Sequence, residues 1–204
     1  MTRRARIGLS IVFLALAGLA VAVRILLDRG FSAREEPTAV EKFVARRLRH
    51  LAVPRSERER KNPVPTSPEV LRDARAHFAD HCASCHGNDG RGRTQVGQGL
   101  YPKAPDMTLP ETQSLADGEL FFIIENGVRL TGMPAWGTGT GEGAEESWEL
   151  VHFIRHLPKI TLEEIAEMEG LNPRSRKELE EEEQMRRFLE GENVPASPAP
   201  VHRH

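Results

Sequence analysis

The chain is poor in cysteine and in aromatic residues, and both shortages limit the kinds of fold and site that it can form. It has 2 Cys, 2 Trp, 1 Tyr and 8 Phe among 204 residues. Aromatic residues make up 5% of the chain and charged residues 28%. This composition offers few large apolar side chains for the core of a 200-residue domain. A smaller globule flanked by exposed segments fits better. A large prosthetic group would supply apolar volume that the side chains do not.

Other absences exclude whole classes of function. The net charge is −2, so no strong basic excess points to a nucleic-acid partner. No glycine-rich phosphate loop follows a strand, and nothing suggests hydrolysis. No segment alternates apolar and polar residues convincingly, which leaves helix as the only regular structure and predicts an all-α protein.

Only one long apolar run is present, and it lies at the N-terminus. Arg3, Arg4 and Arg6 precede an apolar stretch that continues to Leu27, interrupted only by Arg24. Twenty-one helical residues span about 31 Å, enough to cross a hydrocarbon core of roughly 30 Å. Residues 1–27 therefore predict a retained transmembrane helix or signal anchor. The alternative is a cleaved signal peptide, with a small-x-small site at residues 20–22.

The rest of the chain divides into three predicted parts. Residues 28–66 carry ten basic and six acidic side chains and predict a basic linker, with an amphipathic helix from its apolar positions between 40 and 51 or simply a solvated segment. The proline-rich stretch 62–68 marks a boundary before a globular domain at 67–158. Residues 159–204 predict an acidic helical extension and a disordered tail.

Both cysteines lie in the sequence CASCH, where His86 directly follows the second. A zinc site needs further ligands, and the nearest candidates are His152 and His156; adjacent ligands at positions 85 and 86 also fit one tetrahedral ion poorly. A redox-active disulfide of this spacing is typical of a βαβ scaffold, which the sequence does not offer. The C-x-x-C-H spacing favours covalent attachment of haem c through Cys82 and Cys85, with His86 as the iron ligand.

The chain resembles the class I cytochromes c, the small single-haem domains found in anchored cytochromes and in respiratory oxidase subunits. The resemblance covers about residues 68–158 and rests on four segments in order: CASCHGNDGRG (82–92), YPKAPDM (101–107), DGELFFIIENGVRLTGMPAWG (117–137) and WELVHFIRHL (148–157). It implies the class I cytochrome c fold around one haem c. Phe78 corresponds to an aromatic position at which the first and last helices of the family pack together.

The resemblance also implies the remaining site residues. Met133, in the sequence GMP, is the expected sixth ligand of the iron, and Met107 is the alternative thioether. Bis-histidine ligation by His152 or His156 is a further alternative. Pro102 or Pro105 is expected to offer a backbone carbonyl to the ring of His86. The metal ligands are thus predicted as His86 and Met133, with Cys82 and Cys85 completing the cofactor site and no catalytic residues.

These expectations together describe an electron carrier rather than an enzyme. With both axial positions filled, the iron would exchange electrons by outer-sphere cycling between ferrous and ferric. The predicted partners are membrane-bound redox proteins, with no nucleic acid and no small-molecule substrate. The expected location is the bacterial inner membrane, with the haem domain on its periplasmic face. The alternatives are a haem c subunit of a larger oxidoreductase or terminal oxidase and, in another class, a haem-based gas or redox sensor.

Overall fold

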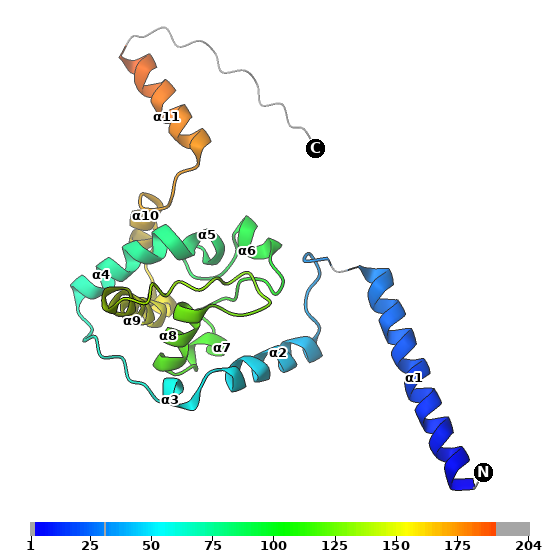
Figure 1. Cartoon of the computed structure of the whole chain (residues 1–204). Helices are drawn as coiled ribbons and strands as arrows, with labels where there is room; N and C mark the ends of the chain where they lie inside the picture. Colours follow the sequence, from blue (N-terminus) through cyan, green and yellow to red (C-terminus); the bar gives the residue numbers. More distant parts are fainter. Residues whose placement is uncertain (1–2, 31, 191–204) are drawn as a thin grey trace.

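The computed structural model describes residues 3–30 and 32–190, and the regular elements in these ranges are all helices joined by loops. No strand occurs in these two ranges, in agreement with the predicted all-α class. Figure 1 shows a long N-terminal helix, a cluster of helices that forms the domain, and a last helix that leads away from it. Residues 191–204, predicted as a tail, lie outside the described residues. In chain order the helices are α1 (Arg3–Arg29), α2 (Ala39–Ala52), α3 (Arg55–Arg58), α4 (Pro68–His77), α5 (Ala83–His86), α6 (Gln95–Gly99), α7 (Pro110–Gln113), α8 (Asp117–Asn126), α9 (Gly141–His156), α10 (Leu162–Glu169) and α11 (Arg176–Leu189).

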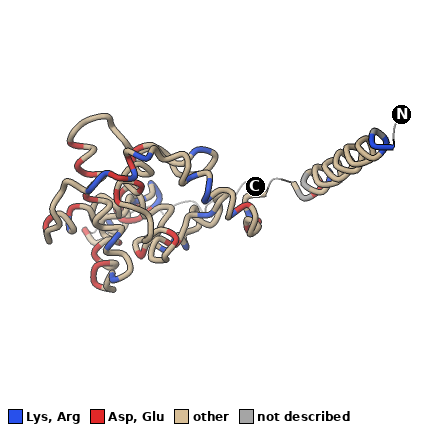
Figure 2. Tube along the Cα trace, turned by 90° about the horizontal axis from the view of Figure 1, so that it is seen from below, with Lys and Arg blue, Asp and Glu red and all other residues tan. Residues whose placement is uncertain are grey.

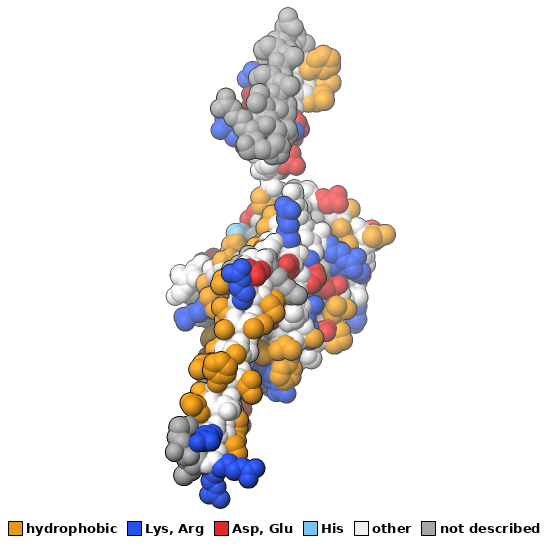
Figure 3. Space-filling view, turned by 90° about the vertical axis from the view of Figure 1, so that its right-hand side faces the viewer, with side chains coloured by type: hydrophobic (Ala, Val, Ile, Leu, Met, Phe, Trp, Pro, Cys, Tyr) orange, Lys and Arg blue, Asp and Glu red, His pale blue; other side chains and the backbone are white. Residues whose placement is uncertain are grey.

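Helix α1 stands apart from the domain and is apolar along most of its length. Its stretch Arg6–Ile25 is long and apolar enough to cross a membrane, and none of that stretch is buried within the structure. Hydrophobic side chains cover this helix in Figure 3, whereas the trace in Figure 2 shows acidic and basic residues interspersed over the domain. Near its C-terminal end, Arg24 Nε pairs with Asp28 Oδ2 at 3.0 Å. By length and composition α1 fits the predicted membrane span, although a signal sequence has the same character.

The core of the domain forms where α4 and α9 cross. Ser67 caps α4 by accepting a hydrogen bond from the Val70 N–H, and Pro68 occupies the first turn, where no backbone donor is needed. The aromatic rings of Phe78 and Phe153 meet at the crossing, with their centroids 5.0 Å apart and both side chains buried. This is the contact between first and last helices that the resemblance implies for Phe78.

Helix α8 completes the core from the other side of α9. The rings of Phe121 and Trp148 stack at 4.1 Å with an angle of 10° between their planes. Gly127 then ends α8 with a φ of 64°, a conformation that glycine adopts without strain. The sequence predicts α8 with the same bounds.

The stretches at 87–110 and 137–143 are rich in glycine and predict loops, but both contain helix. Helix α9 begins at Gly141, inside the stretch expected to be a glycine-rich loop, because Thr140 accepts a hydrogen bond from the Gly143 N–H and caps it. Helix α6 lies within the expected loop at 87–110, capped in the same way by Thr94. In both cases one threonine side chain satisfies a free backbone donor of the first turn, which outweighs the low helix propensity of glycine.

Residues before and after the predicted range 67–158 also pack on the domain. Val53 is buried, and a Cβ at Gly118 would overlap the carbonyl oxygen of Glu57, so α3 sits directly against α8. The Arg60 guanidinium lies 4.6 Å from the Phe121 ring centroid. On the other side, Met168 of α10 belongs to the buried core, whereas α11 buries no residue. Because residues on both sides of the range 67–158 pack on the domain, the boundaries at 67 and 158 stay predictions from the sequence.

Candidate functional site

The CASCH segment begins at an irregular turn in the first helix of the domain. Residues Phe78–Cys82 form a π-helical turn, in which the N–H of Ala83 donates to the carbonyl of Phe78. Such a turn inserts one residue and changes the direction of the side chains that follow. Helix α5 (Ala83–His86) then carries Cys85 and His86 and ends at Gly87, whose φ is 73°. The buried Phe78 thus anchors the segment that presents both cysteines.

The two cysteines are unpaired and lie on neighbouring turns. Burial, with a smaller contribution from Cys85, raises the pKa of the Cys82 thiol to about 12. A redox-active dithiol needs a lowered thiol pKa, because the thiolate is the reacting form. Across the described residues, no group of three or more His, Cys, Asp or Glu side chains is placed to hold a metal ion. Neither observation favours the redox disulfide or the zinc site that the motif alone leaves as alternatives.

The ring of His86 is held in a form suited to binding a metal. Burial lowers the pKa of His86, and hydrogen bonding to the backbone of Pro105 opposes that effect in part. The ring is therefore neutral at physiological pH, which is the form in which histidine ligates metals. Its Nδ1 is buried, and the carbonyl of Pro105 lies near enough to act on the ring without completing a well-directed hydrogen bond to that atom. Of the two prolines predicted from the sequence, Pro105 rather than Pro102 is the one whose backbone interacts with the His86 ring.

Backbone hydrogen bonds fix the loop that brings Pro105 to His86. The N–H of Gly92 donates to the His86 carbonyl at 2.7 Å, and the N–H of Ala104 donates to the Gly97 carbonyl at 3.0 Å. Gly92 has a φ of 67°, and a Cβ there would overlap the carbonyl oxygen of Ala104. The loop can close against His86 only because position 92 has no side chain.

Thr94 ties the same loop to the cysteine segment. Its hydroxyl donates to the carbonyls of Ser84 and Cys85, at 2.8 and 3.0 Å, and accepts from the N–H of Gly97 at 2.9 Å. Sequence reasoning did not select this residue. Its position before a short helix indicates a cap, but nothing in the sequence indicates that its hydroxyl also reaches the carbonyls between the two cysteines.

Met133 lies in a loop that the protein holds by several backbone contacts. The Val128 N–H donates to the Met133 carbonyl at 3.1 Å, and the Met133 N–H donates to Thr131 Oγ1 at 3.1 Å. Further along, the N–H of Trp136 donates to the carbonyl of Ile124 at 3.0 Å, which fastens the loop to α8. The half-buried thioether is thus presented from a fixed loop rather than from a helix.

The loop of Met133 meets the other two segments of the site. A Cβ at Gly132 would lie 2.6 Å from Leu100 Cδ2, so this loop touches the one that follows His86. The Trp136 ring meets the His81 ring edge-on at 5.3 Å, directly before Cys82 in the chain. Trp136 and Cys82 also pack on the same buried core. The structure therefore brings the cysteine segment, the Pro105 loop and the Met133 loop together.

The alternative axial ligands have other contacts. Met107 is a buried member of the hydrophobic core, and its N–H donates to the Gly90 carbonyl at 2.8 Å. The His152 ring lies within hydrogen-bond distance of the Val64 carbonyl, at 2.7 Å, and of the Thr66 hydroxyl. His156 Nε2 pairs with Glu164 at 2.9 Å. These contacts favour Met133 as the thioether ligand and give both histidines structural roles.

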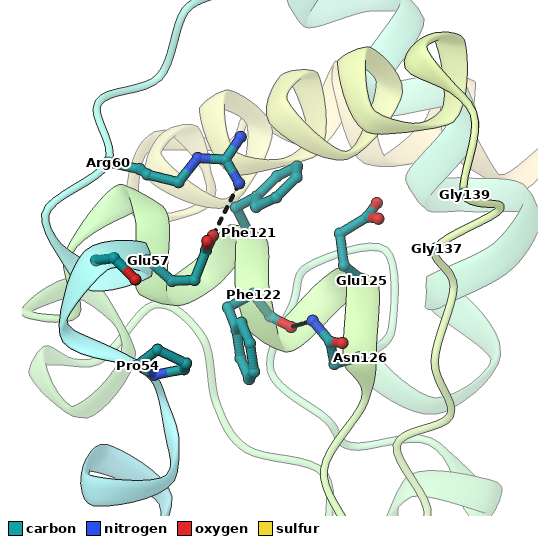
Figure 4. A pocket seen from close by; sticks show the side chains of 10 residues that line it. Pro54, Glu57, Arg60, Phe121, Phe122, Glu125, Asn126, Gly137 and Gly139 are labelled. Carbon is teal, nitrogen blue, oxygen red and sulfur yellow. Dashed lines mark hydrogen bonds and ion pairs between the residues drawn. The ribbon is translucent and has the colours of Figure 1, made fainter.

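A separate cavity of about 510 Å³ lies between α3 and α8 and includes none of the predicted ligands. Figure 4 shows Arg60 reaching toward Glu57, with which it pairs at 2.8 Å, beside Phe121, Phe122 and Glu125. The Arg60 side chain is already held by this pair and by the aromatic rings beneath it. The cavity is therefore not a second half of the site.

Comparison with known proteins gives two matches to the domain. Residues 69–154 match the family described as cytochrome C oxidase, cbb3-type, subunit III. The cbb3-type cytochrome c oxidase subunit FixP of Sinorhizobium medicae (strain WSM419) is 30% identical over 95 residues, which are 46% of this chain and 30% of that protein. The chain thus matches under a third of the length of this relative. The family match covers the part of the chain that carries Cys82, Cys85, His86 and Met133.

Proposed function

We propose, from the premise that residues 69–154 form a c-type cytochrome domain, that this chain carries electrons in a bacterial respiratory chain while α1 anchors it in the membrane. The single observation that carries the proposal is that three segments meet: the C-x-x-C-H turn, the loop that brings Pro105 to His86, and the Met133 loop, which touches Leu100 and His81. A family match over the same residues supports it.

The residues present fit one covalently bound haem c. Cys82 and Cys85 would hold the porphyrin through thioether bonds, and His86 and Met133 would take the two axial positions of the iron. The buried Nδ1 of His86, with the Pro105 carbonyl beside it, is what an axial histidine requires of its second nitrogen. When bound, the haem supplies one-electron chemistry by alternating between ferrous and ferric iron.

Neighbouring residues and loops of the protein position the two proposed iron ligands, His86 and Met133. Pro105 orients the His86 ring and raises its basicity as a ligand. The hydrogen bonds at Val128, Thr131 and Trp136 keep the Met133 loop in one place, so that its thioether need not be reordered for each electron transfer. If His86 and Met133 both hold the haem iron, their side chains would leave no position for a substrate. This supports a non-catalytic carrier rather than an enzyme.

A subunit of a larger oxidase is the second candidate, favoured by the names of the matched proteins. In that case the domain relays electrons to a catalytic centre in another chain. For both candidates we propose that the N-terminus lies on the cytoplasmic side of the membrane and the domain in the periplasm. The two candidates are distinguished by solubilising membranes in mild detergent and purifying the chain by an affinity tag at its C-terminus. A stoichiometric complex with an oxidase supports the subunit, and a monodisperse single chain supports the free carrier.

The cofactor itself is tested with a pyridine haemochrome spectrum of membranes from a host that assembles c-type cytochromes. The full chain is expected to give a c-type spectrum in the membrane fraction. The double variant Cys82→Ser/Cys85→Ser is expected to lose it, and the matched control Ser84→Ala, which changes the exposed residue between them, is expected to keep it. A c-type signal that survives removal of both cysteines, or none in the unmodified chain, contradicts the proposal.

A further inference from the structure

Helix α2 carries an apolar face that nothing in the described part of the chain covers. Five apolar residues at helical spacing form this face, and their exposed fractions lie between 45% and 73%. We name it the α2 apolar face: Val40, Phe43, Val44, Leu48 and Leu51. The helix buries no residue at all. In an ordinary surface helix these positions would face the core of the domain.

Polar residues of α2 outside the α2 apolar face make its contacts with the domain. His50 Nδ1 lies 3.3 Å from Glu119 Oε1, and Glu119 is a carboxylate of α8 that is only 3% exposed. Arg46 pairs with Glu111 at 3.6 Å, and the Tyr101 hydroxyl donates to Glu41 at 3.0 Å. Two of the basic residues of α2, Arg46 and His50, are thus used within the protein. Because these polar residues are fixed to the domain, the apolar face is directed outward.

The chain itself places a lipid surface next to α2. Helix α1 ends at Arg29 and α2 begins at Ala39, so nine residues connect them. Nine residues reach at most about 30 Å when fully extended. Part of this connection is also held to the domain, because Lys103 pairs with Glu36. Figure 1 shows α2 along the edge of the domain, in the segment that leads on from α1.

We propose that α2 lies in the headgroup region of the membrane with its apolar face inserted, and that it thereby holds the cytochrome domain in one orientation against the bilayer. The occupant of the α2 apolar face is lipid, because a helix with one apolar face and a charged opposite face lies in the membrane interface when a bilayer is within reach. Arg47 lies within this face, and its guanidinium carbon is 5.6 Å from the Phe43 ring centroid, so its long side chain would have to extend along the apolar surface to reach a headgroup phosphate. The inference rests on the proposed anchoring by α1.

The test uses the full holoprotein in nanodiscs of phosphatidylcholine and phosphatidylglycerol, with one chain per disc. A spin label is attached at Leu48→Cys, since in the holoprotein Cys82 and Cys85 are expected to be blocked as thioethers. The matched control is Leu179→Cys on α11, another exposed leucine of a helix (60% and 52% exposed, respectively). Collision with oxygen and with a water-soluble nickel complex reports the depth of each label.

The label at position 48 is expected to collide at least several-fold more often with oxygen, relative to nickel, than the label at 179. Adding Leu51→Glu is expected to return the position-48 label to water, whereas Leu51→Ala leaves it in lipid. Two labels of equal nickel accessibility, in a protein that has inserted into the discs, overturn the inference and leave the anchor intact. Dipolar broadening that persists without lipid points to a second copy on this face and overturns it as well. A chain that does not insert into the discs overturns both the anchor and the inference.

Discussion

The contact between Phe78 and Phe153 gives the most quantitative prediction. Phe78→Ala removes a ring that is 1% exposed and that meets the fully buried ring of Phe153 at 5.0 Å. A buried phenylalanine covers about 150–200 Å² of apolar surface, worth about 4–5 kcal/mol at roughly 25 cal/mol per Å². Partial collapse of the cavity recovers some of this, so we expect the free energy of unfolding to fall by about 4 kcal/mol.

The assay is guanidinium unfolding of the holoprotein, followed by far-ultraviolet circular dichroism. The matched control is Phe188→Ala on α11, which removes an exposed ring and is expected to change the free energy by less than about 0.5 kcal/mol. Phe153→Ala and the double variant complete a cycle, in which the two rings are expected to couple by about 0.5–1.5 kcal/mol. A loss below about 1 kcal/mol for Phe78→Ala, with an unchanged denaturant slope, refutes the placement of this ring at the crossing of α4 and α9.

Three further predictions concern the site and its surroundings. Gly92→Ala is expected to cost at least about 2 kcal/mol and to reduce the yield of holoprotein, because its φ is 67° and a Cβ meets a carbonyl oxygen of the loop; Gly99→Ala, with open space around it, is the control in the same unfolding assay. Met133→Ala is expected to keep the covalent haem but to lower its reduction potential and to lose the thioether-to-iron charge-transfer band, so an unaltered band identifies another sixth ligand. Burial alone would raise the pKa of Glu164, but hydrogen bonds from His156 and from the Thr161 backbone, together with Arg75, lower it below 4.5. The ionised Glu164 carboxylate therefore stabilises the folded protein above pH 4.5, and this stabilisation is lost as the pH falls through the lowered pKa. Glu164→Gln is accordingly expected to cost about 1 kcal/mol at pH 7 and progressively less as the pH falls through the lowered pKa, and a cost that does not change with pH contradicts this assignment.

The sequence predicts the local parts of this protein well, because they depend on short spacings. The bounds of α8, the proline at the start of α4, the apolar run of α1 and the C-x-x-C-H turn all follow from neighbours within one or two helical turns. The contact of Phe78 with the last helix of the domain, where it meets Phe153, could be predicted only because the order of motifs resembles a known family.

Contacts between distant segments could not be predicted from spacing. Nothing in the local pattern distinguishes Pro105 from Pro102 as the partner of His86, since that depends on how the loop at 92–107 closes over Gly92. The segment 28–66 shows the same limit: its pattern predicts an amphipathic helix or a solvated segment, but does not predict the contact between His50 and Glu119 of the domain. Such pairings depend on the packed structure, where a buried carboxylate determines which face of a helix turns inward.

The most direct test of the central claim is mass spectrometry of the peptide that contains Cys82 and Cys85, prepared from protein made in a host that assembles c-type cytochromes. The account predicts that this peptide carries the added mass of one haem, with no other peptide modified in this way. Recovery of the peptide with both thiols unmodified would contradict it.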